Sequence, residues 1–201
     1  MHQYLQDTRF AVEGLIALIT QDAVEYTLLR EQHEKAAAKD AYYHTAFQLR
    51  EMGPDANYWY AMRYEAGTAL NGLAAELREL EDRIVDKRQS LAALSGAVLQ
   101  IAKQGISSVR KRPDNTPNTR EVFGVDIKWL IWAARNQSIH YENPQEINDE
   151  TQKVFDQLNA ARPPEAPLDP RSQINWAHEI IQALGWESYL QYEVDMSSLL
   201  G

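Results

Sequence analysis

The stretch LNGLAAELRELEDRIVDKRQSLAALSGAVLQI, residues 70–101, decides the fold of this chain. Its apolar residues alternate at spacings of three and four, at Leu70, Leu73, Leu77, Leu80, Ile84, Leu91, Leu94, Val98 and Ile101. Lys87 is the single polar interruption, and charged residues fill the positions between. Such a repeat is typical of a long helix with a coiled-coil-like apolar seam. We therefore interpret the stripe as core or as a dimer seam, and not as a cofactor site.

Residues 3–50 predict a partner for this helix. They are rich in helix-forming residues and contain no proline. Their apolar side chains recur along one helix face, at Leu5, Val12, Ile16, Ile19, Ala23 and Tyr26. One helix, or two with a break near residues 33–40, would fit this pattern. This helical segment should end at Gly53-Pro54-Asp55-Ala56-Asn57, because glycine and proline both interrupt helices. The simplest arrangement is an antiparallel hairpin of helices over residues 1–50 and 57–110.

The remainder of the chain predicts shorter helices. Residues 112–120 hold two prolines and several Asn and Asp residues, which favours a loop. Asp126 is a candidate N-cap for a helix that runs to about Tyr141, before Pro144. A second helix is expected from Ile147 to Ala161. A proline-rich linker over residues 161–170 should follow it.

Two helices are expected at the end of the sequence. One runs from Ser172 to Leu184 with Gly185 as its C-cap, and another spans Trp186 to Leu200. No strand-like alternation is present. The fold class is therefore all-α, a helical bundle with a long hairpin. We expect a single domain over residues 1–201, with the hairpin at 1–111, further helices at 121–161 and C-terminal helices at 171–201.

Composition and charge exclude several classes of function. The chain carries 20 basic and 29 acidic side chains, a formal net charge of -9 at pH 7, which disfavours broad nonspecific binding to duplex nucleic acid. The lack of cysteine excludes disulfides and thiolate nucleophiles. The start has no signal-peptide pattern, and the longest apolar runs fall well short of the roughly 20 residues of a membrane span. We expect a cytoplasmic protein with no membrane contact.

Positive charge gathers in one segment only. Residues 101–130 hold six basic and three acidic side chains, whereas residues 141–201 hold three basic and eleven acidic ones. The basic segment is either a solvated loop flank or a local RNA contact. The side chains that would contact RNA are Arg110, Lys111, Arg112, Arg120 and Lys128, together with Tyr141.

Directly after this segment, Arg135-Asn136-Gln-Ser-Ile-His140 places a cation, an amide and an imidazole within six residues. On a helix, Asn136 and His140 face the same way, while Arg135 lies about 140° around from His140 and roughly 7.5 Å along the axis. One helix cannot close all three groups onto one phosphate. Two copies meeting across a twofold axis can, which predicts a homodimeric site.

The chemistry that suits these groups is cleavage of an RNA phosphodiester. An imidazole, with a reference pKa of about 6.5, can take the proton of a ribose 2′-hydroxyl. A guanidinium can bind the phosphate and stabilise developing charge. No Gly-rich phosphate loop, His-Glu-x-x-His or Glu-x-x-His pair is present, so neither a metal nor a cofactor is predicted. Alternatively, Arg135 and His140 only satisfy carbonyls at a helix C-terminus.

At these residues the sequence resembles the HEPN superfamily, whose hallmark is Arg-x4-6-His, often Arg-Asn-x-x-x-His, near the end of a bundle helix. Arg135, Asn136 and His140 match that pattern position for position. The resemblance implies a metal-independent endoribonuclease that acts as a dimer, with Arg135 and His140 catalytic and Asn136 supporting them. It also implies a role as a toxin or in antiviral defence, in some cases beside a nucleotidyltransferase antitoxin. The motif covers six residues.

A second interpretation assigns the chain no catalysis. In it the protein is a helical interaction or adaptor protein, the hairpin seam is its functional surface, and Arg135 and His140 are structural.

Overall fold

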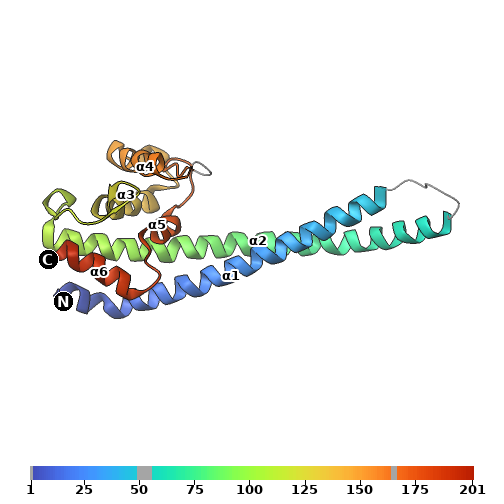
Figure 1. The fold of residues 1–201 in the computed structure, drawn as a ribbon, viewed down its shortest axis with the longest axis horizontal. Coiled ribbons are helices and arrows are strands. Elements are labelled where there is room, and N and C mark those ends of the chain that lie inside the picture. Colours follow the sequence, from blue (N-terminus) through green and yellow to red (C-terminus); the bar gives the residue numbers. More distant parts are fainter. Residues whose placement is uncertain (1, 49–55, 164–166) are drawn as a thin grey trace. The chain divides into compact units, whose positions relative to one another are not determined.

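The computed structural model describes residues 2–48, 56–163 and 167–201. The prediction of an all-α protein is confirmed, because six α-helices carry most of the described chain (Figure 1). They are α1 (Gln3–Gln48), α2 (Ala56–Arg110), α3 (Ile127–His140), α4 (Asp149–Ala161), α5 (Ala177–Leu184) and α6 (Tyr189–Leu200). Short 3-10 helices occupy Pro113–Asn115 and Pro144–Glu146. Within the described ranges, no helix is long and apolar enough to cross a membrane.

Two compact units make up the chain. The first comprises residues 1–21 and 90–201, and the second comprises residues 22–89. Each unit therefore takes part of α1 and part of α2. Residues 3–48 form one helix without a break near 33–40, which settles the alternative left open by the sequence. Gly53, Pro54 and Asp55 of the predicted turn lie outside the described residues, as do residues 164–166 of the predicted linker.

In the second unit, α1 and α2 pack along the seam that the repeat predicts. Leu80 is buried against Leu29 and Ala36, with Leu77 and Ile84 packed beside them. The stripe is thus core in this unit.

Lys87, the polar interruption of the stripe, contacts acidic residues of α1. Its Nζ lies 2.7 Å from a carboxylate oxygen of Glu25 and 2.9 Å from one of Asp22. The hydrogen bonds to Glu25 and Asp22 raise the pKa of Lys87. A lysine is compatible with this position of the seam because its ammonium pairs with the carboxylates of Asp22 and Glu25.

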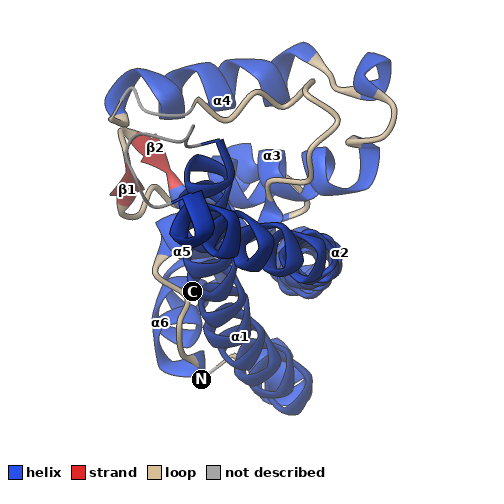
Figure 2. Cartoon of the chain, turned by 90° about the vertical axis from the view of Figure 1, so that its right-hand side faces the viewer, coloured by secondary structure: helices blue, strands red, loops and turns tan. Residues whose placement is uncertain are grey.

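The first unit holds most of the deeply buried side chains. Leu5, Val12, Ile16 and Ile19 of α1 are buried there, as the N-terminal periodicity predicts. Figures 1 and 2 show α3 between α2 and α4, and α6 beside the first turns of α1 and the last turns of α2. The close approach of α1 to α2 requires glycine at position 105, because a β-carbon there would lie 2.7 Å from the ring of Tyr4.

A two-stranded antiparallel hairpin precedes α3, contrary to the expectation of no strands. Its strands are β1 (Glu121–Val122) and β2 (Val125–Asp126), with Glu121 opposite Asp126 (Figure 2). Phe123 and Gly124 connect them with φ of 50° and 75°. Positive φ at both central residues is the geometry of a two-residue hairpin turn, which Gly124 favours. Strands of two residues are too short to produce a visible alternation.

The predicted start of α5 at Ser172 is wrong. The helix begins at Ala177, and Gln173 has a φ of 59°, outside the helical region. The reason is a buried side chain on another helix. Gln137 Nε2 donates to the carbonyl of Ile174 at 2.7 Å, and its Oε1 accepts from the backbone N–H of Trp176 at 3.1 Å. These tertiary hydrogen bonds hold the segment in a turn. The C-cap at Gly185 is confirmed, with a φ of 68°.

Candidate functional site

The motif lies on α3, and the sequence signals at the two ends of this helix are confirmed. Asp126 is the N-cap and its carboxylate accepts from the backbone N–H of Lys128 at 3.1 Å. The helix ends at His140, next to the predicted end at Tyr141. Ile127, Leu130 and Ile131 are buried and anchor the helix in the core. The motif therefore occupies the last two turns of a helix that is fixed from its start.

Arg135 points toward α2. Its Nε donates to Oε1 of Gln100 at 2.6 Å, and the side chain is half-buried. Burial lowers the pKa of the Arg135 guanidinium from its usual value. In the described ranges, Arg135 forms no ion pair with a carboxylate. A half-buried guanidinium without an acidic partner can take up an anion.

Asn136 points toward α4. Its Nδ2 donates to Oγ1 of Thr151 at 2.9 Å, and Thr151 is buried in the first turn of α4. The side chain of Asn148 caps that turn by accepting from the N–H of Thr151 at 2.8 Å. Asn136 therefore fixes the start of α4 against α3.

His140 pairs with a carboxylate from the 3-10 helix that follows. Its Nδ1 lies 2.5 Å from Oε2 of Glu146, and Asn143 Nδ2 lies 3.5 Å from the other carboxylate oxygen. Because a carboxylate oxygen only accepts, Nδ1 carries the hydrogen of this bond. Among the described residues, Nε2 of the ring has no hydrogen-bond partner. The arrangement is an imidazole oriented by an acid through one nitrogen.

The three motif side chains do not converge within one copy of the chain. Arg135, Asn136 and His140 each contact a different element: α2, α4 and the 3-10 helix at Pro144–Glu146. Their contacts agree with the helix geometry that separates Arg135 from His140.

The sequence reasoning missed the partners Gln100, Thr151 and Glu146. Of these three partners, only Glu146 lies close enough in the sequence to the motif to have been found as a candidate. It lies six residues after His140, just beyond the helix-ending Pro144.

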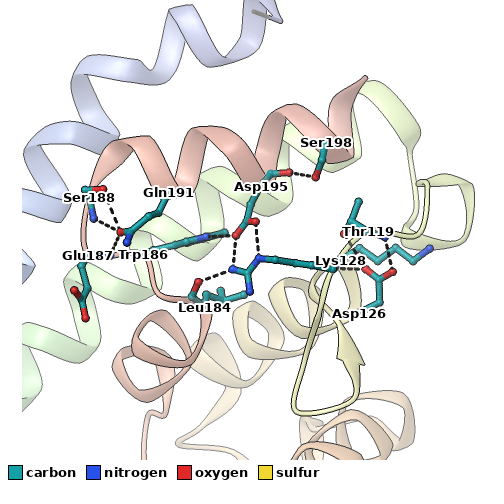
Figure 3. Close-up of polar contacts among 11 residues, drawn as sticks. Thr119, Asp126, Lys128, Leu184, Trp186, Glu187, Ser188, Gln191, Asp195 and Ser198 are labelled. Carbon is teal, nitrogen blue, oxygen red and sulfur yellow. Dashed lines mark hydrogen bonds and ion pairs between the residues drawn. The ribbon is translucent and has the colours of Figure 1, made fainter.

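Arg120, one of the candidate RNA contacts, binds the carboxylate of Asp195 within the fold; Figure 3 labels Asp195 and its neighbours Leu184 and Trp186. Nε and Nη2 of Arg120 donate to the two carboxylate oxygens of Asp195 at 2.7 and 2.6 Å, and Nη2 also donates to the carbonyl of Leu184 at 2.5 Å. The indole N–H of Trp186 donates to the same buried carboxylate at 2.7 Å. Arg120 thus joins the loop before α3 to α5 and α6.

Lys128, another candidate, is also used within the fold. It is buried, and its Nζ donates to the carbonyl of Thr116 at 2.8 Å and to Oδ1 of Asn118 at 2.7 Å. These bonds fix the loop before the hairpin. Arg120 and Lys128 are thus both engaged in contacts within the fold, and their role in RNA binding stays a prediction.

The remaining candidates lie near the end of α2 or beside the motif. Arg110 donates from Nη2 to the carbonyl of Leu200 at 3.0 Å, so it holds the end of α6. Lys111 and Arg112 are exposed, and Lys111 has a φ of 69° directly after the helix. The hydroxyl of Tyr141 donates to Glu142 at 3.0 Å, and this hydrogen bond raises its pKa.

A cavity of about 450 Å³ lies between the β-hairpin, α3 and α4. Its polar lining includes Glu121, Glu150, Lys153 and Gln157, and Trp129 contributes an aromatic wall. None of the three motif side chains lines it. Among the described residues, the cavity lining included, no three histidine or acidic side chains lie close enough together to hold a metal ion.

Comparisons with known proteins return no match to a family model, a curated protein or a solved structure.

Proposed function

We propose that this protein is a metal-independent endoribonuclease of the HEPN type, with Arg135, Asn136 and His140 in its site. The observation that carries the proposal is the contact of His140 Nδ1 with Glu146 at 2.5 Å. A carboxylate that fixes one ring nitrogen orients the other for proton transfer, which is the arrangement of a general base. Glu146 would be a positioning residue, and Nε2 of His140 would act on the substrate.

The reaction uses the substrate's own nucleophile. His140 Nε2 takes the proton of a ribose 2′-hydroxyl, and the 2′-oxygen forms a bond to the adjacent phosphorus. The bond from phosphorus to the 5′-oxygen breaks, and that oxygen takes a proton from the imidazolium. The products are a 2′,3′-cyclic phosphate and a 5′-hydroxyl end. Arg135 stabilises the negative charge on the non-bridging oxygens.

A second copy of the chain would complete the site. Within one copy, Arg135 is held by Gln100 of α2, while His140 is held by Glu146 beyond the end of α3. Across a twofold axis near the end of α3, the Arg135 of each copy can approach the His140 of the other. Asn136 supports the site indirectly, because it fixes α4 through Thr151.

Cleavage of an unstructured RNA by the purified protein in EDTA tests the proposal. We expect His140→Ala to slow cleavage about 10²–10⁴-fold and Arg135→Ala about 10²–10³-fold, by loss of the general base and of charge stabilisation. Glu146→Gln should slow cleavage without weakening RNA binding. His33→Ala is the matched control, because His33 also pairs with a carboxylate, that of Glu81 at 3.5 Å, in the second unit. Cleavage that is absent in the wild type, or that survives both motif substitutions, contradicts the proposal.

A cytoplasmic ribonuclease of this kind would act as a toxin or as an effector of antiviral defence. Expression of the wild-type chain should then arrest growth, and His140→Ala should relieve the arrest. A protein antitoxin, such as a nucleotidyltransferase, would be the partner that restrains it. Copurification with a protein that suppresses cleavage would support that part of the proposal.

A noncatalytic interaction protein is the second candidate, and one observation favours it. The second unit exposes several large aromatic side chains: Tyr42, Phe47, Tyr58, Tyr60 and Tyr64, with exposed fractions of 65, 42, 59, 74 and 71%. Exposed tyrosines are enriched in protein interfaces. The leucine seam is occupied within the chain, so these aromatic residues, rather than Leu77 or Leu80, would form the binding surface. Tyr60→Ala and Tyr64→Ala would then abolish partner binding while Arg135→Ala and His140→Ala leave it intact.

A further inference from the structure

A second cation lies beside Arg135. Lys103 is on α2, and its Nζ lies 4.5 Å from the centroid of the Trp132 ring. Trp132 precedes Arg135 by about one turn on α3, as Gln100 precedes Lys103 on α2. Gln100 contacts Arg135 and Lys103 contacts Trp132, so the four side chains pair across two helices of the first unit.

The two cations are not neutralised by the fold. Over residues 2–48, 56–163 and 167–201, neither Lys103 nor Arg135 forms an ion pair with an acidic side chain. Burial lowers the pKa of Lys103, and the positive charge of Arg135 lowers it further. Two like charges held side by side repel each other, and an anion bound between them relieves that repulsion.

The geometry around each cation fits an anion with several oxygens. The bond from Arg135 Nε to Gln100 fixes the plane of the guanidinium and leaves its two terminal nitrogens for a ligand. The face of Trp132 holds the Lys103 ammonium by a cation–π contact while its other sides can donate hydrogen bonds. A phosphate group offers oxygens to both.

We propose that Lys103 and Arg135 together bind one phosphate of a single-stranded RNA, with Trp132 and Gln100 as positioning residues. The identity of the polyanion as RNA rests on the proposed function. The binding step itself does not require cleavage. Lys103 lies outside the motif, near the beginning of the basic segment of residues 101–130.

Binding of a labelled 2′-O-methyl RNA oligonucleotide, measured by anisotropy in EDTA over a range of salt, tests the proposal. This probe lacks the 2′-hydroxyl and cannot be cleaved. Lys103→Met removes the charge but keeps an unbranched side chain against Trp132. We expect it to weaken binding several-fold at low salt and to reduce the slope of log K against log salt by about 0.7 for each phosphate that is no longer neutralised. Lys103→Arg should restore both.

Lys39→Met is the matched control, because Lys39 is an exposed lysine of the second unit. It should leave affinity and salt slope unchanged, and circular dichroism should show that all variants are folded. The proposal is overturned if the wild type does not bind the probe, or if Lys103→Met has the wild-type salt slope.

Titration with inorganic phosphate separates the two sources of this ligand chemistry. If phosphate binding depends on Lys103 but oligonucleotide binding does not, the site takes a free anion, and the RNA proposal fails.

Cleavage of unmodified RNA is measured separately. If Lys103→Met has a reduced salt slope but the wild type does not cleave RNA, the phosphate site is supported and the proposed ribonuclease activity is contradicted. Cleavage with an unchanged slope removes the phosphate site alone.

Discussion

His178 is a single residue that couples stability to pH. It lies on α5, partly buried, with Nδ1 3.4 Å from the hydroxyl of Ser95. Burial lowers the pKa of His178 below its usual value. As the pH falls below about 6.5, the unfolded chain takes up a proton at this position that the folded chain does not, so the free energy of unfolding decreases. Above that pH both states are neutral there, and the effect disappears.

His178→Gln should therefore flatten this part of the pH dependence. Urea unfolding at pH 7.5 and 5.5, followed by circular dichroism, measures the free energy of unfolding of both proteins. We expect the difference between the two pH values to be smaller in the variant than in the wild type. An equal difference in both proteins would show that His178 does not titrate differently in the folded state.

Single residues also show where prediction from sequence stops. Asp126 could be identified as an N-cap because an N-cap bonds only to residues next to it in the chain. Arg135, Asn136 and His140 could be located by spacing. Gln100 and Thr151 could not be identified as their partners, since those contacts join residues 35 and 15 positions apart. The ion pair of Arg120 with Asp195, which joins residues 75 positions apart, could not be predicted for the same reason.

At the scale of elements, the pairing of α1 with α2 in the first unit depends on a missing side chain. A β-carbon at Gly105 would lie 2.7 Å from Cε1 of Tyr4 and 3.2 Å from Cε of Met196. The Tyr4 ring cannot easily move aside, because its hydroxyl donates to the carbonyl of Ile101 at 2.7 Å. Close packing of this kind leaves no room for an added methyl group.

Gly105→Ala is thus expected to lower the free energy of unfolding by about 1–3 kcal/mol, the usual range for overpacking. Gly72→Ala on the same helix is the matched substitution. A β-carbon at Gly72 would meet no atom within 4 Å apart from its chain neighbours and its own helix backbone, so alanine should raise stability by about 0.5–1 kcal/mol through helix propensity alone. Thermal and urea unfolding measure both. A stabilising effect at both positions would contradict the packing of Tyr4 over Gly105.

Elements with strong periodicity were predictable, and those set by tertiary contacts were not. The repeat over residues 70–101 lies within α2, and its buried leucines face the core as expected. Residues 172–176 have helix-compatible composition, but Gln137 binds their backbone and α5 begins later. The hairpin at Glu121–Asp126 depends on positive φ values at two residues, Phe123 and Gly124. Only Gly124 is of a residue type that indicates positive φ in the sequence.

At the scale of the whole molecule, the division into two units left no trace in the sequence. The boundaries fall at residues 21/22 and 89/90, inside α1 and α2. The apolar stripe continues across the second boundary, from Ile84 to Leu91, and neither proline nor glycine marks it. Boundaries of this kind follow from the contacts of the remaining chain, whereas sequence signals for domains depend on linkers.

The proposed twofold site has a quantitative consequence when two inactive variants are mixed. An Arg135→Ala copy keeps His140, and a His140→Ala copy keeps Arg135. Each mixed dimer therefore has one intact site and one site that lacks both groups. Random exchange at equal concentrations makes about half of the dimers mixed, so cleavage should recover to about a quarter of the wild-type rate. An inactive mixture, with subunit exchange verified by labelled copies, would place both groups of the site in one chain.

The contacts around α3 differ in the length of chain that each must close, and this implies an order of folding. His140 meets Glu146 across six positions, and Asn136 meets Thr151 across fifteen. The Arg120–Asp195 pair closes seventy-five positions. Short loops cost less entropy to close and form faster. We expect the imidazole–carboxylate pair to form early in folding, and Arg120 to meet Asp195 only when the last helix docks.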